Sequence, residues 1–218
     1  TLDYLKSLNH KVTYSDQNSG VCVAFNEAAK KSSKDYIVLA HDDMYFCPKW
    51  DEVLNKELKQ IPQNIDFFLS GTMVQPFESY INLDCGSNIN NFNEEKLLEN
   101  VSKIKFEDFQ GTHWQPSLIP LKTWNKVGGF SEEFSPGLGS DPDFNMKLWN
   151  IGVRLFKGLG DCRVSSTTLT NGPCGGGVVP ICACVLYRSL FSLSINSHRL
   201  RSTASFSICH SNLVSGSH

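Results

Sequence analysis

The 218-residue sequence lacks long apolar runs and a strong excess of charge of either sign. No stretch approaches the roughly 20 apolar residues that a membrane-spanning helix needs. No initiator methionine, signal peptide or internal repeat is present. The formal net charge of -2 argues against a nucleic-acid surface, because such surfaces are basic. We therefore expect a protein of the cytoplasm, either free or bound peripherally at the inner face of a membrane.

Acidic residues and lysine are missing from the end of the chain. Residues 162–218 contain no Asp, Glu or Lys, whereas serine and cysteine are frequent. A zinc module would need paired C-x2-4-C ligands, which Cys182-x-Cys184 does not provide. A disulfide-rich extension would need an oxidising compartment, which nothing upstream indicates. The third alternative is favoured by the abrupt change: residues 166–218 are not native coding sequence, as after a shift of reading frame, and have little packed structure.

The most informative segment is a glycine-rich, acidic stretch at 128–149, GGFSEEFSPGLGSDPDFNMKLW. Its second half predicts a helix that begins at Asp141-Pro142, because aspartate suits an N-cap and proline a first helical position. Apolar residues follow at helical spacing, and Gly152 suits the helix end. The loop would deliver the Asp141 carboxylate to the mouth of this helix. From the local pattern alone, Asp141 is either a simple cap or a functional carboxylate.

A second acidic segment follows a short apolar run at 37–40. Such a run predicts a strand that is buried on both faces of a parallel sheet. It ends at His41, Asp42 and Asp43, and ligands in open α/β sheets bind beyond the carboxyl ends of the strands. Carboxylate oxygens there suit a hard cation, which can neutralise a diphosphate. An ordinary acidic turn is the alternative interpretation.

Two further elements are predicted between these segments. Residues 66–74, DFFLSGTMV, read as a strand, and residues 93–104, NEEKLLENVSKI, read as an amphipathic helix that Asn93 caps.

The ordered pattern GGF…E.F…G…D.DF resembles that of family 2 glycosyltransferases, which have the GT-A fold. Residues 18–36 are similar to another segment of that family. The resemblance implies an α/β fold, GT-A-like and Rossmann-like, with a mostly parallel sheet flanked by helices. It implies that Asp141 is the general base, and that Asp43, at the last position of the family's D-x-D motif, binds Mg²⁺ or Mn²⁺. Ser140 and Lys147 replace the family's usual glutamate and arginine.

The same resemblance assigns substrate contacts. It implies that the nucleotide-sugar donor is bound by His41, Asp42, Asn26 and Gly20. Acceptor contacts are expected from His113, Trp114 and Gly139, although a tryptophan in such a segment is more often part of the core.

The resemblance extends over residues 1–165, which we expect to form a partial GT-A domain ahead of the 166–218 tail. In the family, two opening strands hold the nucleotide base and ribose. Nothing similar precedes residue 18, so we expect the domain to be incomplete at its N-terminus and to bind nucleotide sugars poorly or not at all.

These observations favour a glycosyltransferase that moves a sugar from a nucleotide-sugar donor to a glycan or other hydroxyl acceptor. The resemblance implies an inverting, metal-dependent reaction. A sugar-nucleotide-forming nucleotidyltransferase is the first alternative, although the glycine-rich basic phosphate loop that it needs is not seen. A non-catalytic carbohydrate-binding relative is the second alternative.

Overall fold

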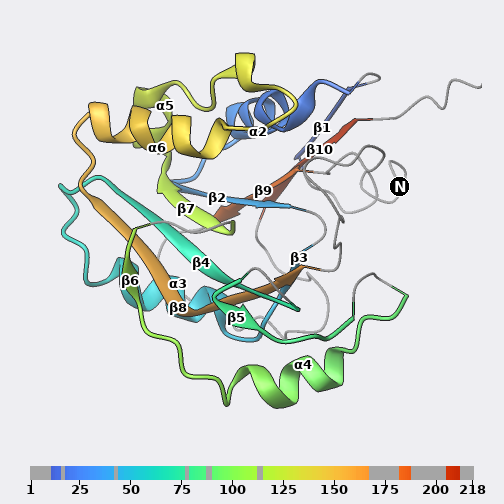
Figure 1. Ribbon diagram of the computed structural model, residues 1–218. Coiled ribbons are helices and arrows are strands. Elements are labelled where there is room, and N and C mark those ends of the chain that lie inside the picture. Colours follow the sequence, from blue (N-terminus) through green and yellow to red (C-terminus); the bar gives the residue numbers. More distant parts are fainter. Residues whose placement is uncertain are drawn as a thin grey trace, which may run out of the picture.

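In the part of the chain that the computed structural model describes, ten strands form one mixed sheet, with helices packed on both of its faces (Figure 1). The structure describes residues 11–15, 18–41, 44–76, 79–86, 90–111, 115–166, 182–187 and 205–211. The strands are β1 (Lys11–Ser15), β2 (Tyr36–His41), β3 (Met44–Phe46), β4 (Phe67–Gln75), β5 (Ile81–Asn82), β6 (Phe109–Gln110), β7 (Ser117–Pro120), β8 (Leu155–Ser166), β9 (Cys182–Tyr187) and β10 (Ser205–Ser211). The helices are α2 (Gly20–Lys30), α3 (Trp50–Leu58), α4 (Glu94–Val101), α5 (Leu121–Val127) and α6 (Ser140–Asn150), with a 3-10 turn η1 (Glu132–Phe134).

The predicted strand at 37–40 is confirmed as β2, which lies inside the sheet. Its residues alternate between two cores, as the pleat requires. Ile37 and Leu39 pack with α2, α5 and α6, whereas Val38 packs with α3 on the opposite face. All three side chains are fully buried. The continuous apolar run thus reflects burial on both faces of the sheet.

The sheet is less parallel than we predicted. Strand β4 pairs in parallel with β5 and β8, but β2 pairs antiparallel with both of its neighbours, β7 and β9. An apolar run reports that both faces of a strand are covered, and it carries no information on the direction of the neighbouring strands. The α/β class is therefore confirmed, and the sheet is mixed.

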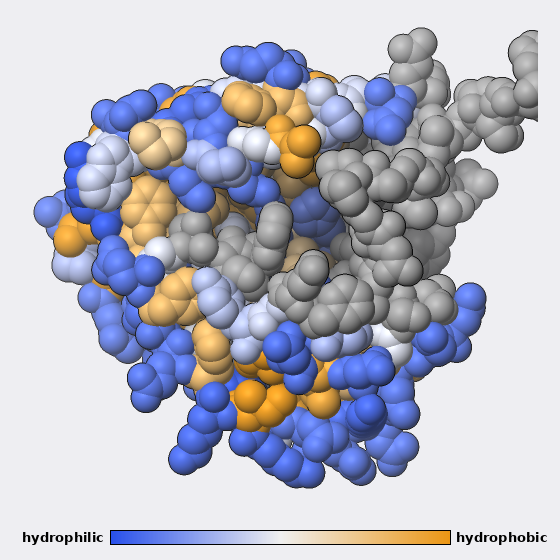
Figure 2. All heavy atoms as spheres, in the orientation of Figure 1, coloured by the Kyte–Doolittle hydropathy of each residue, from blue (hydrophilic) through white to orange (hydrophobic). Residues whose placement is uncertain are grey.

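The helix predicted at 93–104 is confirmed as the shorter α4. The Asn93 side chain accepts a hydrogen bond from the Lys96 backbone N–H at 2.9 Å, which is the predicted N-cap. Leu97 and Val101 pack into a third cluster with Val74 of β4. Figure 2 shows apolar residues gathered beside α4, at the lower centre of the visible face.

Two segments of the tail differ from our expectation of little packed structure after residue 165. Strand β9 pairs with all six residues of β2, and β10 lies between β9 and β1. Both segments are uncharged and rich in β-branched, aromatic or cysteine residues, which suit strands. They pair through the backbone with edges of β1 and β2 that would otherwise be open. The division into domains at 165/166 stays a prediction.

Within the described residues, no helix is both long enough and apolar enough to cross a membrane.

Candidate functional site

The end of β2 and the start of β7 meet at one edge of the sheet. Leu39 pairs with Ser117 in the antiparallel ladder, so His41 and the Gln115 segment lie at the same edge. His41 is half-buried, and its ring contacts the edge of Phe25 in α2 at a centroid distance of 5.7 Å. This edge is where the sequence predicted a ligand site.

A hydrogen-bonded clamp holds the GGF segment against α2. The Asn26 side chain is buried, and its amide nitrogen donates to the Phe130 carbonyl at 2.9 Å and to Glu132 Oε1 at 3.0 Å. Its amide oxygen accepts from the Phe130 N–H at 2.9 Å. A side chain at Gly129 would collide with this amide, since an added Cβ would lie 2.3 Å from Asn26 Oδ1. Asn26 therefore fixes the path of the loop toward Asp141.

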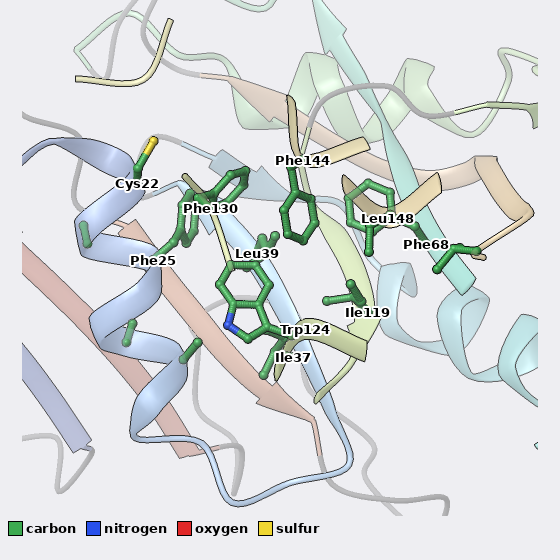
Figure 3. Close-up of a cluster of buried hydrophobic side chains, with 14 residues drawn as sticks. Cys22, Phe25, Ile37, Leu39, Phe68, Ile119, Trp124, Phe130, Phe144 and Leu148 are labelled. Atoms are coloured by element: carbon green, nitrogen blue, oxygen red, sulfur yellow. The ribbon is translucent and has the colours of Figure 1, made fainter. Parts of the chain in front are cut away.

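Aromatic side chains also hold the GGF segment in place by packing around Phe130. Phe130 packs against Phe25, Trp124 and Phe144, with ring centroids 5.6, 5.5 and 4.7 Å apart (Figure 3). These rings come from α2, the GGF segment, α5 and α6. One cluster therefore joins the four parts of the chain that lie around the end of β2. The phenylalanine of the GGF pattern is thus a core anchor.

The glycine loop docks on the first turn of α2. The Val21 N–H donates to the Pro136 carbonyl at 3.1 Å. Gly137 has a φ of 151°, and an added Cβ would lie 2.5 Å from Val21 Cγ1. Gly20, which we predicted to contact the donor, lies at this junction, with its N–H bonded to Asn18 Oδ1.

Helix α6 begins earlier than predicted, which changes the environment of Asp141. The N-cap is Gly139, with a φ of 86°, and no side chain caps the helix. Ser140 Oγ instead donates to the Gly137 carbonyl at 2.7 Å. Asp141 is thus in the first turn of α6, and the prediction that it is the N-cap is wrong. Glycine reaches a left-handed conformation at little cost, so it replaces a side-chain cap here.

The Asp141 carboxylate is held by a side chain from a different part of the chain. Gln115 Nε2 donates to Asp141 Oδ1 at 3.2 Å. Among the described residues, Asp141 Oδ2 has no hydrogen bond. Burial raises the pKa of Asp141, and the Gln115 hydrogen bond and the nearby His41 only partly oppose this rise. The site thus contains a partly buried carboxylate with one fixed oxygen and raised basicity.

Two other polar residues steady the loop that leads to Asp141. Asp143 Oδ2 accepts a hydrogen bond from Ser131 Oγ at 2.7 Å. Lys147 Nζ donates to the Gly129 carbonyl at 2.7 Å and to Ser131 Oγ at 3.1 Å. Lys147, which stands where the family usually has arginine, therefore ties α6 back to the GGF segment.

The structure brings together only some of the predicted site residues. His41 and Asp141 share one edge, with Gly139 just before the carboxylate. Asn26 uses both amide hydrogens and its oxygen on the loop, so the geometry gives it a positioning role, and donor contact stays a prediction. Four predicted residues lie outside the described part of the chain: Asp42, Asp43, His113 and Trp114.

Sequence reasoning missed Gln115, which is the direct partner of Asp141. The sequence offered one signal for Gln115, which is its position just before the short strand that ends at Pro120. Using that signal required knowing that β7 runs antiparallel to β2, which the sequence did not reveal.

The described residues contain no group of three or more His, Cys, Asp or Glu side chains placed to hold a metal ion. Asp43, which we predicted for that role, is not among those residues, and neither is the neighbouring Asp42, which we predicted to contact the donor. Their carboxylate oxygens are of the type that Mg²⁺ and Mn²⁺ prefer, so the chemistry of this donor set suits such an ion.

Comparison with known proteins places the chain in a family. The family model described as Glycosyl transferase family 2 matches residues 1–112, which is just over half of the 218 residues. No curated protein matches the chain significantly. The matched part includes α2, β2 and β4, whereas the segment with Asp141 follows it. The chain therefore belongs to glycosyl transferase family 2.

Proposed function

We propose that this protein transfers a sugar from a nucleotide-sugar donor to an acceptor hydroxyl with inversion at the sugar carbon. The family supports glycosyl transfer in general. The observation that carries the finer proposal is the state of Asp141, a partly buried carboxylate with a raised pKa at the edge where β2 ends.

Asp141 is proposed as the general base. A carboxylate with a raised pKa is a stronger base than an exposed aspartate, and it takes a proton from a hydroxyl more readily. Gln115 fixes the orientation of Oδ1, and Oδ2 is proposed to receive the acceptor proton. One displacement assisted by such a base inverts the reacting carbon, because the hydroxyl attacks opposite the leaving diphosphate.

A divalent cation, Mg²⁺ or Mn²⁺, is proposed to be held by Asp43. When bound, it would neutralise charge on the leaving diphosphate. Proposed donor contacts stay His41, Asp42, Gly20 and Asn26. Proposed acceptor contacts stay Gly139, His113 and Trp114.

The first experiment compares the full chain with Asp141→Asn and, as control, Glu133→Gln. Glu133 is an exposed acid of the same loop. Release of nucleoside diphosphate is measured with a panel of UDP-, GDP- and dTDP-sugars, with and without sugar acceptors. We expect Asp141→Asn to lower kcat by about 10²-fold, the scale of lost general-base assistance, while the donor KM changes little.

Two results of this experiment would contradict the proposal. One is full transfer activity in Asp141→Asn, which would leave the carboxylate without a role as base. The other is a loss of activity in Asp141→Asn that a higher donor KM explains entirely, since the loss of a general base lowers kcat. An equal loss in Glu133→Gln would show that the loop, and not the carboxylate, is what the reaction requires.

The metal proposal has its own test in Asp43→Asn. A neutral amide is a poorer ligand for a hard cation than a carboxylate. We expect the Mn²⁺ concentration for half-maximal turnover to rise at least about tenfold, with kcat partly restored at high Mn²⁺. Unchanged activity of the unmodified chain in excess EDTA would contradict the metal proposal without touching the role of Asp141.

A further inference from the structure

A pocket of about 740 Å³ opens at the edge of the sheet opposite to Asp141. It lies where β2 and β4 begin and where β7 ends. The first residues of β2 and β4 lie at the left of the sheet in Figure 1. The six residues of β2 separate this pocket from His41 by roughly 17 Å, at about 3.3 Å per residue. The pocket is therefore separate from the proposed donor and acceptor site.

The floor of the pocket is apolar and partly aromatic. Tyr36 and Phe67, the first residues of β2 and β4, place their rings 6.0 Å apart and tilted by 31°. Ile61 and Ile65 of the α3–β4 connection line it further, and Ile65 is 41% exposed. A volume of this size, with an apolar floor and a few polar groups, is typical of small-molecule sites.

The rim of the pocket is basic. Lys34, Lys59 and Lys122 line it together with a single carboxylate, Asp35. Lys122 is partly neutralised, because its Nζ lies 3.4 Å from Asp66 Oδ1, which also accepts a hydrogen bond from Thr123. Within the described part of the chain, Lys34 and Lys59 form no ion pair. Two ammonium groups thus remain available to an anion above an apolar floor.

We infer that this pocket binds a small organic anion that carries an apolar ring or chain. The ring or chain would lie on Tyr36, Phe67 and Ile61, and the anionic group would face Lys34 and Lys59. A purely inorganic anion would leave the apolar floor uncovered, and a neutral hydrocarbon would leave both ammonium groups unpaired. The ligand therefore needs both an apolar part and an anionic group. This inference does not depend on the proposed reaction at Asp141.

Calorimetric titration of the full chain with naphthalene-2-sulfonate tests this inference. We expect saturable binding, at least about tenfold tighter than that of 2-naphthalenemethanol or inorganic phosphate, since each of these lacks one of the two parts. The double variant Lys34→Gln/Lys59→Gln keeps most of each side-chain stem and removes both charges. We expect it to bind about tenfold more weakly, the scale of two exposed ion pairs.

The matched control is Lys103→Gln/Lys105→Gln, which removes two exposed lysines outside the pocket and should bind as the unmodified chain does. Gln63→Trp, which places a bulky ring at the pocket lining, should also weaken binding. The inference falls if the sulfonate does not bind at millimolar concentration, if the neutral alcohol binds equally well, or if the Lys34/Lys59 variant matches the control. Competition by UDP that is unchanged in the Lys34/Lys59 variant would assign the binding to the Asp141 edge and would overturn the inference as well.

Discussion

The replacement Asn26→Leu tests how strongly the loop before Asp141 depends on α2. Leucine has the same branched arrangement of side-chain heavy atoms as asparagine but can neither donate nor accept a hydrogen bond. It would remove three hydrogen bonds of 2.9, 3.0 and 2.9 Å, two of which satisfy the buried backbone of Phe130. At a net value of about 0.5–1.5 kcal/mol each, the loss is roughly 2–4 kcal/mol in the free energy of unfolding.

Urea denaturation followed by tryptophan fluorescence measures this loss, because Trp124 packs directly against Phe130. Asn64→Leu is the control, since Asn64 is exposed. Glu132→Ala should show an intermediate cost of about 1 kcal/mol, because it removes only one of the three bonds. A cost below about 1 kcal/mol for Asn26→Leu would refute the view that Asn26 is a clamp that the fold requires.

Three further replacements have expected outcomes that urea denaturation can check. Burial raises the pKa of Asp141 above its ordinary value of 3.8, so its ionised form destabilises the fold at neutral pH. Asp141→Asn should therefore unfold at a higher urea concentration than the unmodified chain at pH 7, and this gain in stability should vanish below about pH 4. A gain in stability that persists at low pH would contradict the upward direction of the pKa shift. Gly137→Ala should cost about 1–3 kcal/mol through strain and the contact with Val21, and Val21→Ala should restore part of it; no rescue would exclude that contact as the cause. Arg163→Met should cost about 2–4 kcal/mol and speed hydrogen exchange in α4, because the buried guanidinium donates to the carbonyl of Val101, the last residue of that helix, and to that of Ile104 just beyond it; unchanged exchange would refute this role.

The parts of the fold that the sequence predicted are those with local causes. The buried run at 37–40 and the Asn93 cap follow from burial and from a hydrogen bond to a residue three positions ahead. The start of α6 was misplaced because two caps compete within three residues. Gly139 reaches a left-handed φ of 86° and begins the helix, which leaves Asp141 in its first turn. The choice between such caps depends on the surrounding packing.

Strand direction and pairing had no local signal. Strands β2 and β7 are separated by 75 residues of chain, and nothing in either sequence indicates that they run antiparallel. The same holds for β9 and β10, since the missing acids and lysines of the tail led us to expect little packed structure there. Backbone pairing needs only strands with open edges, so composition could not exclude them from the sheet. Gln115 was missed for this reason, since its contact with Asp141 depends on how β7 is paired.

The candidate site draws on two stretches of sequence that are linked only by the fold. The family match ends at residue 112 and supplies α2 and the end of β2, whereas Asp141 comes from the following segment. Three independent connections bring them to one edge: the ladder of β2 with β7, the Asn26 clamp, and the Gln115 hydrogen bond to Asp141. A carboxylate that served only as a surface cap would need none of these connections, and it would not be left with a raised pKa. A partly buried carboxylate that separate parts of the chain hold at the end of β2 is the physical argument for our proposal that Asp141 is the general base.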